Sequence, residues 1–201
     1  MTIFRKKNIP NILTSFRILL IPAFLYFLFS GFNHAKTISF LIFVLASTTD
    51  ALDGFYARKY NLISRFGIFF DPIADKLLVL SAFYSFMFIP VLSEEVKLWM
   101  IFLISFRDIL VTILRMIMEH KGITMVTSKI GKLKTILQMT TIILVLLYLI
   151  LFSYDISFWR FISEKSILYF SMLVTTLVTF YTGLHYFYFN HKFLQNFFFK
   201  K

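Results

Sequence analysis

The sequence predicts an all-α, polytopic membrane protein, a bundle of six transmembrane helices that follows a short N-terminal juxtamembrane segment. Of its 201 residues, 59% are hydrophobic, and the mean hydropathy of +0.79 lies well above that of a soluble domain. The apolar runs also reach the length of about 20 residues that a helix needs to cross a bilayer. A chain of this length is expected to form a single domain, residues 1–201.

The expected spans are separated by short polar segments. Residues 1–10 are basic, end at Pro10 and are expected to lie at the membrane surface. The spans are expected at roughly 11–32, 37–58, 67–90, 97–119, from after Thr135 to about 153, and 166–189. The first span shows no small-residue cleavage site, so we expect it to be retained rather than removed as a signal peptide.

The start of the third span has two interpretations. Pro72 directly follows Asp71, which suits a helix that begins there with Asp71 as its cap. A helix that begins one turn earlier is the alternative, because proline is tolerated inside membrane helices. Either start keeps Asp71 and Asp75 on one helical face.

Loop charge predicts the orientation. The N-terminal segment, the connector 59–66, the region 120–134 and the C-terminal tail are basic, whereas the loops near 33, 94 and 155–165 are neutral or mixed. The positive-inside rule therefore places both termini on the cytoplasmic side of the cell (inner) membrane. The net charge of +11 then suits anionic lipid headgroups in the bilayer, and no nucleic-acid motif is visible. The chain has no cysteine, which excludes thiolate catalysis and a thiolate metal site.

Four acidic residues interrupt the apolar pattern where the second span ends and the third begins. Asp50 and Asp53 are three residues apart, and Asp71 and Asp75 are four apart, so each pair shares a helical face. A carboxylate in the middle of a membrane costs about 2.5–3.5 kcal/mol, so four of them need compensation. If the two helices are antiparallel neighbours, the four converge, and oxygen-only ligands favour magnesium, manganese or calcium over zinc. The alternative is a charge-paired contact between helices.

The same stretch has small residues that permit close approach, and a basic residue that suits a phosphate. Gly54, Ala57 and Gly67 let a ligand or a facing backbone come near, and Arg58 lies one turn beyond Gly54. The whole pattern reads Asp50-x-x-Asp53-Gly54-x-x-Ala57-Arg58, eight residues, then Gly67-x-x-x-Asp71-x-x-x-Asp75. It resembles the signature of the CDP-alcohol phosphotransferase family, and every fixed position of that signature is present.

The resemblance implies residue roles. The family transfers a phosphoryl-linked group from a CDP-activated substrate to an alcohol, with Mg²⁺ or Mn²⁺ as cofactor. By resemblance, Asp50, Asp53 and Asp71 are metal ligands, and Asp75 is the general base and a further metal ligand. Gly54, Arg58 and Ser64 are, also by resemblance, contacts to the cytidine diphosphate part of the lipid donor.

Three polar residues at the start of the first span share one helical face, because Asn11, Thr14 and Arg17 are spaced by three. One interpretation is a helix cap with an arginine that snorkels to the interface. We favour the other, a polar wall that faces the acid cluster, because members of the resembled family commonly begin in a similar way. On this interpretation Asn11 and Thr14 belong to the CDP-lipid site, and Arg17 to the acceptor-phosphate site.

Further basic residues lie near the predicted cytoplasmic ends of the fourth and fifth spans. Arg107 and Arg115 are eight apart and share a face, and Lys132 and Lys134 open the fifth span. With a lysine, the two arginines could hold the phosphate of a phosphorylated acceptor. The alternative is snorkelling. Asp108 adjoins Arg107, but neighbouring residues do not face each other on a helix, so we do not expect the two to pair.

A narrower resemblance extends over nearly the whole chain. The segments Asn8-Ile-Pro-Asn-x-Leu-Thr-x-x-Arg17, Arg107-Asp-x-x-Val-Thr-x-Leu-Arg115, Lys121-Gly122 and Gly131-Lys-Leu-Lys-Thr-x-x-Gln-Met139 are similar to the phosphatidylglycerophosphate synthase branch of the family. That branch usually has glutamate where Asp108 stands. The resemblance implies CDP-diacylglycerol as donor, sn-glycerol 3-phosphate as acceptor, and a homodimer. The alternatives are another acceptor (inositol phosphate, serine or phosphatidylglycerol) or a cation transporter that uses the acids as an ion site.

Overall fold

A computed structural model describes residues 9–60, 65–120 and 129–199, and the side chains of 14–49, 73–118 and 131–191. The described residues form seven α-helices and one 3-10 turn, so the all-α prediction is confirmed for this part of the chain. The elements are α2 (Ile9–Phe29), α3 (Ala35–Tyr60), α4 (Arg65–Phe86), η1 (Pro90–Leu92), α5 (Leu98–His120), α6 (Lys129–Ser153), α7 (Phe158–Glu164) and α8 (Ile167–Phe199).

Each expected span corresponds to one long helix, with four differences. Helix α6 begins at Lys129 rather than after Thr135. Helix α4 begins at Arg65, so Pro72 lies inside the helix, and the interpretation of Asp71 as its cap is wrong. The loop expected at 155–165 contains α7, whose seven residues are too few to show an apolar period. Helix α8 runs on to Phe199, because backbone hydrogen bonding continues where the apolar run stops.

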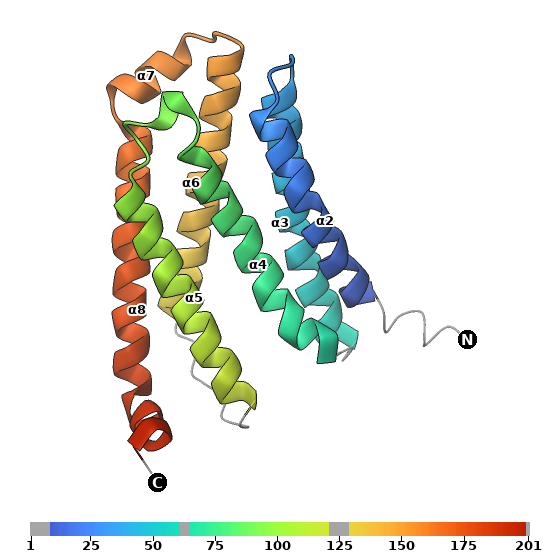
Figure 1. Cartoon of the computed structure of the whole chain (residues 1–201), viewed down its shortest axis with the longest axis vertical. Coiled ribbons are helices and arrows are strands. Elements are labelled where there is room, and N and C mark those ends of the chain that lie inside the picture. Colours follow the sequence, from blue (N-terminus) through green and yellow to red (C-terminus); the bar gives the residue numbers. More distant parts are fainter. Residues whose placement is uncertain (1–8, 61–64, 121–128, 200–201) are drawn as a thin grey trace, which may run out of the picture.

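The long helices form one elongated bundle (Figure 1). Helices α2, α3 and α4 pack as one group, and α5 and α6 both pack on α8; contacts of α3 with α6, and of α4 with α5 and α6, join the groups. The beginning of α2, the adjoining ends of α3 and α4, those of α5 and α6, and the end of α8 all lie at the lower end of Figure 1. The helix ends that border the basic segments therefore share one end of the bundle.

The apolar core lies in the upper part of the bundle, where the two helix groups meet. Its buried side chains come from all six long helices and include Phe24, Leu28, Phe43, Leu78, Phe83, Phe86, Met100, Ile101, Ile104, Val145, Leu146 and Met172. Between α6 and α8 the packing turns polar, with the Thr141 and Thr175 hydroxyl oxygens 2.7 Å apart. Lipid tails are as apolar as these side chains, so close packing and such hydrogen bonds hold membrane helices together.

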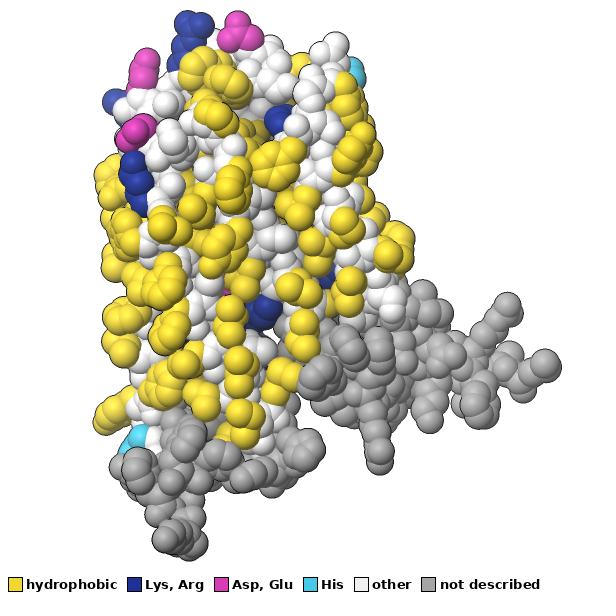
Figure 2. Space-filling view, in the orientation of Figure 1, with side chains coloured by type: hydrophobic (Ala, Val, Ile, Leu, Met, Phe, Trp, Pro, Cys, Tyr) yellow, Lys and Arg dark blue, Asp and Glu magenta, His cyan; other side chains and the backbone are white. Residues whose placement is uncertain are grey.

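Large apolar side chains also cover the outside of the bundle along its length (Figure 2). Exposed examples are Leu19, Tyr26, Phe102, Ile136, Phe170 and Tyr188. An apolar surface of this extent suits lipid rather than water. Among the described residues, Gly131–Ser153 and Ile167–His191 are long and apolar enough to cross a membrane, and Thr14–Phe29 and Ala35–Thr49 are shorter apolar stretches. The count of six spans stays a prediction.

A carboxylate from the segment between η1 and α5 contacts the beginning of α8. Glu95, which follows η1 and is buried, accepts a hydrogen bond from the backbone N–H of Tyr169 at 3.0 Å. Tyr169 lies in the first turn of α8, where backbone N–H groups lack helical partners and the helix dipole favours a negative charge. The contact therefore sets where α8 begins relative to α5.

We predict that Glu95→Ala lowers the free energy of unfolding by about 1–2 kcal/mol, because it leaves the Tyr169 N–H without its acceptor. The measurement is thermal unfolding in detergent micelles. The matched control is Glu94→Ala, whose carboxylate is exposed and pairs with Lys97 at 3.1 Å. Equal destabilisation by the two variants would contradict the capping role.

Candidate active site

The acid motif lies on two helices that pack against each other. Asp50 and Asp53 are in the last turns of α3, and Asp71 and Asp75 are in the first half of α4, near the same end of the bundle. The predicted antiparallel neighbourhood of the two segments is therefore present. The side chains of Asp50, Asp53 and Asp71 lie outside the described residues, as do those of Gly54 and Arg58, and Ser64 lies outside them altogether.

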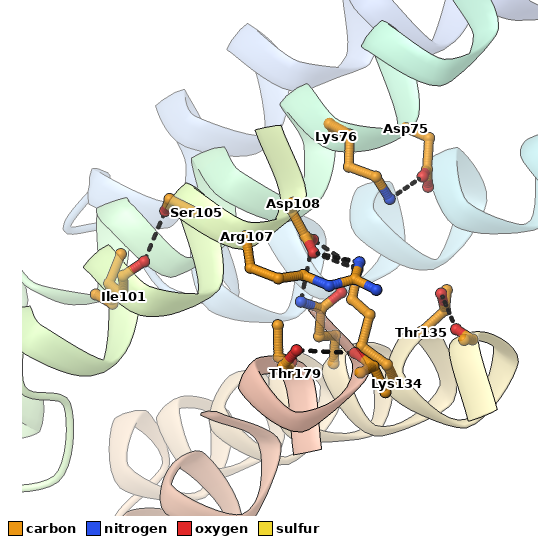
Figure 3. Close-up of polar contacts among 12 residues, drawn as sticks. Asp75, Lys76, Ile101, Ser105, Arg107, Asp108, Lys134, Thr135 and Thr179 are labelled. Atoms are coloured by element: carbon orange, nitrogen blue, oxygen red, sulfur yellow. Dashed lines mark hydrogen bonds and ion pairs between the residues drawn. The ribbon is translucent and has the colours of Figure 1, made fainter. Parts of the chain in front are cut away.

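Asp75 is the one acid of the motif whose side chain is described. Its Oδ2 accepts a hydrogen bond from Lys76 Nζ at 2.7 Å, and both side chains are 20% exposed. Figure 3 shows this pair on α4, facing the polar side chains of α5 and α6. Within the described side chains, no three histidine or acidic groups lie close enough to hold one metal ion. The convergence of the four acids stays a prediction.

A second carboxylate organises the neighbouring part of the bundle. Asp108 on α5 has no exposed surface, and its carboxylate lies 2.6 Å from Lys134 Nζ on α6. Gln138, one turn further along α6, donates an Nε2 hydrogen bond to the same carboxylate at 3.1 Å. Lys76 on α4 also interacts with Asp108 electrostatically. This buried network links α5 to α6 and brings α4 close to both (Figure 3).

Arg107 joins the network from the same helix. Its Nη1 donates to Asp108 Oδ1 at 3.2 Å, so the expectation that these adjacent residues do not pair is wrong. The reason is the length of the arginine side chain, which carries the guanidinium out to the carboxylate of the next residue (Figure 3). The Nε of Arg107 is buried and has no hydrogen-bond partner among the described residues.

The described side chains of this network carry more positive than negative charge. Asp108 faces two cations, Arg107 and Lys134, while Lys76 is balanced by Asp75. The Asp108 carboxylate offsets the charge of one of these two cations. An excess of about one positive charge is left in a largely buried region of the bundle. Buried charge is costly without a partner, so this excess favours the binding of an anion.

The other predicted acceptor residues are placed differently. Arg115 is half-buried on α5, interacts electrostatically with Arg107, and has a buried Nε without a hydrogen-bond partner in the described part. Lys132 is exposed, whereas Lys134, two residues on, is buried. The structure therefore brings Arg107 and Lys134 together on Asp108 and places Lys132 on the outside.

Thr14 and Arg17 are both completely buried on α2. A snorkelling arginine would show its head at the surface, so the burial of Arg17 favours a polar face that points into the bundle. The side chain of Asn11 lies outside the described residues. Contact of this face with the acid motif stays a prediction.

Sequence reasoning did not find Asp108 as the centre of the network, nor any role for Gln138. Lys134 and Gln138 are four residues apart, so their shared face was visible in the sequence. Their partner lies 26 and 30 positions earlier, and only the tertiary structure, in which α5 and α6 both pack on α8, brings it to them.

Comparison with known proteins identifies the family of the chain. The model of the CDP-alcohol phosphatidyltransferase family matches residues 7–181, and the chain belongs to this membrane-protein family. A CDP-diacylglycerol–glycerol-3-phosphate 3-phosphatidyltransferase of Bacillus subtilis is 37% identical over an alignment of 153 residues. The alignment covers 70% of this chain and 77% of the relative. The Rickettsia typhi protein of the same name is 40% identical over 141 residues, 70% of this chain and 77% of the relative. A probable phosphatidylglycerophosphate synthase of Mycobacterium tuberculosis is 38% identical over 141 residues. This alignment covers 69% of this chain and 65% of the relative.

We predict that Asp108→Asn lowers the free energy of unfolding by about 3–5 kcal/mol, because it leaves the buried Lys134 and Arg107 without a counter-charge. Adding Lys134→Met should recover part of the loss. Thermal unfolding of the purified variants measures both. Glu164→Gln is the control, since its carboxylate is exposed at the opposite end of the bundle. A melting temperature for Asp108→Asn equal to that of the control would show that the ion pair does not stabilise the fold.

Proposed function

We propose that the chain transfers the phosphatidyl group of CDP-diacylglycerol to sn-glycerol 3-phosphate, which gives phosphatidylglycerophosphate and CMP. The observation that carries this is that relatives 37–40% identical over about 70% of the chain are named for this reaction. The complete family signature over Asp50 to Asp75 supports the reaction class. The excess positive charge around Asp108 supports a phosphorylated acceptor.

The residues of the motif fit a divalent cation. The four carboxylates occupy two packed helices, and such an oxygen-only donor set suits Mg²⁺ or Mn²⁺. We propose Asp50, Asp53, Asp71 and Asp75 as its ligands. When bound, the metal would neutralise the pyrophosphate oxygens of the donor and stabilise the leaving CMP.

The chain's own groups position the substrates and move the proton. We propose that Asp75 takes the proton from the primary hydroxyl of the acceptor as that oxygen attacks the lipid-side phosphorus. The bond between this phosphorus and the bridging oxygen breaks, and CMP leaves with that oxygen. Lys76, 2.7 Å from Asp75, holds the carboxylate in place. Asn11, Thr14, Gly54, Arg58 and Ser64 are proposed contacts of the CDP-lipid.

The acceptor phosphate is assigned to the basic groups beside the acid motif. Among the described side chains, the Nε of Arg107 has no hydrogen-bond partner, and Arg107 and Lys134 share one carboxylate, that of Asp108. An incoming phosphate can therefore accept hydrogen bonds from both cations. Arg17 and Arg115 are the further proposed contacts from α2 and α5. Lys132 is exposed, and its proposed role is to attract the anionic acceptor from the aqueous side.

The membrane arrangement follows from the helix order. We propose a single domain over residues 1–201, with α2, α3, α4, α5, α6 and α8 as six spans. The basic N-terminal segment, predicted as residues 1–10, is proposed to lie at the membrane surface, with Ile9 and Pro10 already in α2. The helix ends beside the basic segments share one end of the bundle, which the positive-inside rule assigns to the cytoplasmic side. Water-soluble acceptor then reaches the site from the cytoplasm, and donor lipid enters from the bilayer. A homodimer is proposed by resemblance to the family.

The test is CMP release by the purified protein with CDP-diacylglycerol, Mg²⁺ or Mn²⁺, and a panel of acceptors. We expect release with sn-glycerol 3-phosphate, and loss of at least about 10²-fold in Asp71→Asn, by analogy with other groups that act in the transition state. Release only with serine, inositol phosphate or phosphatidylglycerol would change the acceptor. No CMP release with any acceptor, together with cation transport by reconstituted protein, would favour a transporter.

We predict that Arg107→Ala raises the KM for sn-glycerol 3-phosphate by roughly 10- to 100-fold, the worth of a hydrogen bond to a charged group. The KM for CDP-diacylglycerol should change by less than about 2-fold, because the proposed contact is with the acceptor alone. Steady-state kinetics with each substrate varied in turn give both values. Arg160→Ala is the control, an exposed arginine on α7 at the opposite end of the bundle. Equal effects of Arg107→Ala on both KM values would remove Arg107 from the acceptor site.

A further inference from the structure

Helix α8 contributes a glycine to the network at the point where Arg107 lies. Gly183 is buried, and a methyl group in place of its hydrogen would lie 2.8 Å from Arg107 Cγ, 3.7 Å from Nε and 3.8 Å from Cδ. Side-chain carbons do not pack as closely as 2.8 Å. The arginine therefore lies directly against the backbone of α8, in space that exists only because residue 183 has no side chain.

The close atom is the Cγ, near the base of the arginine side chain. This atom cannot move independently, as the end of a flexible side chain can. The overlap with a methyl group at position 183 is therefore removed only by a different rotamer of Arg107 or by a shift of α8 away from α5. Both would disturb the other end of the side chain, where Nη1 is held by Asp108 at 3.2 Å. A side chain at position 183 would thus move the guanidinium out of the network while leaving Arg107 itself in the sequence.

The neighbouring groups of α8 suit the same interpretation. Thr179, one turn before Gly183, is completely buried, and its hydroxyl has no hydrogen-bond partner among the described residues. Figure 3 shows Thr179 on α8, on the side of the network that faces this helix. Tyr186, on the following turn, is also buried and interacts electrostatically with Arg107. Gly183 and Tyr186 therefore place two successive turns of α8 near the Arg107 side chain.

We propose that Gly183 is a positioning residue for the acceptor: its missing side chain seats Arg107 between α5 and α8 with the guanidinium directed at the acceptor phosphate. The proposal rests on the proposed function, because it takes Arg107 as a phosphate contact. It adds α8, which no part of the signature includes, to the elements that determine acceptor binding.

The experiment is a double-mutant cycle between Gly183→Ala and Arg107→Ala, with sn-glycerol 3-phosphate and CDP-diacylglycerol varied in turn. We expect Gly183→Ala to raise the KM for sn-glycerol 3-phosphate about 10-fold in the wild-type background and less than about 2-fold in Arg107→Ala, where no Cγ is left to displace. The KM for CDP-diacylglycerol should stay within about 2-fold in both backgrounds. Gly31→Ala is the matched control, since a methyl group there meets nothing within 4 Å.

Thermal unfolding of the same four proteins keeps the test decisive if Gly183→Ala folds poorly. We then expect Arg107→Ala to restore folding of Gly183→Ala, because it removes the atom that the new methyl group would meet. An unchanged KM in Gly183→Ala, or equal effects in the two backgrounds, would overturn the proposal. If the wild-type protein releases no CMP with sn-glycerol 3-phosphate, the proposed function itself fails, and the unfolding cycle still reports whether Gly183 seats Arg107.

Discussion

A completely buried carboxylate must be neutralised by its immediate neighbours, and around Asp108 this requirement determines how three helices meet. Lys134 and Gln138 on α6 and Arg107 on α5 all donate to it, and Lys76 on α4 lies within its electrostatic reach. Separating α5 from α6 would leave opposite charges in an apolar surrounding, which costs several kcal/mol. The same contact that holds the helices together thus places the cations of the proposed acceptor site beside the α4 segment that carries Asp75.

This network separates the upper part of the bundle from the lower part. Above it lies the apolar core of Phe24, Phe43, Phe83 and their neighbours, closed at the upper end by the contact of Glu95 with α8. Below it lie the adjoining ends of α3 and α4 with the acid motif. Buried packing on one side of the network and the helix ends with the acid motif on the other suit a reaction in which substrates must be positioned closely.

The contribution of α8 shows how a membrane bundle accommodates a large cation. An arginine between helices needs both a counter-charge and room, and these come from different elements: the charge from Asp108 on α5 and the room from Gly183 on α8. Small residues at helix interfaces usually allow backbones to approach each other. Here the small residue allows a charged side chain to approach a backbone instead, which keeps the cation inside the bundle rather than at its lipid face.

The sequence by itself determined the helical class, the approximate position of every long helix, the acid motif and the family, because apolar run length and the fixed spacing of Asp50, Asp53, Asp71 and Asp75 are local properties of the chain. It did not determine the start of α4, since Pro72 is compatible with two helix starts, and it did not reveal α7. Only the tertiary structure decided that Asp108 pairs with Lys134 and with Arg107, that Lys132 points outward, and that Gly183 lies against Arg107. These contacts join residues that are far apart in the chain, or depend on the path of a long flexible side chain, and neither is encoded in spacing along a single helix.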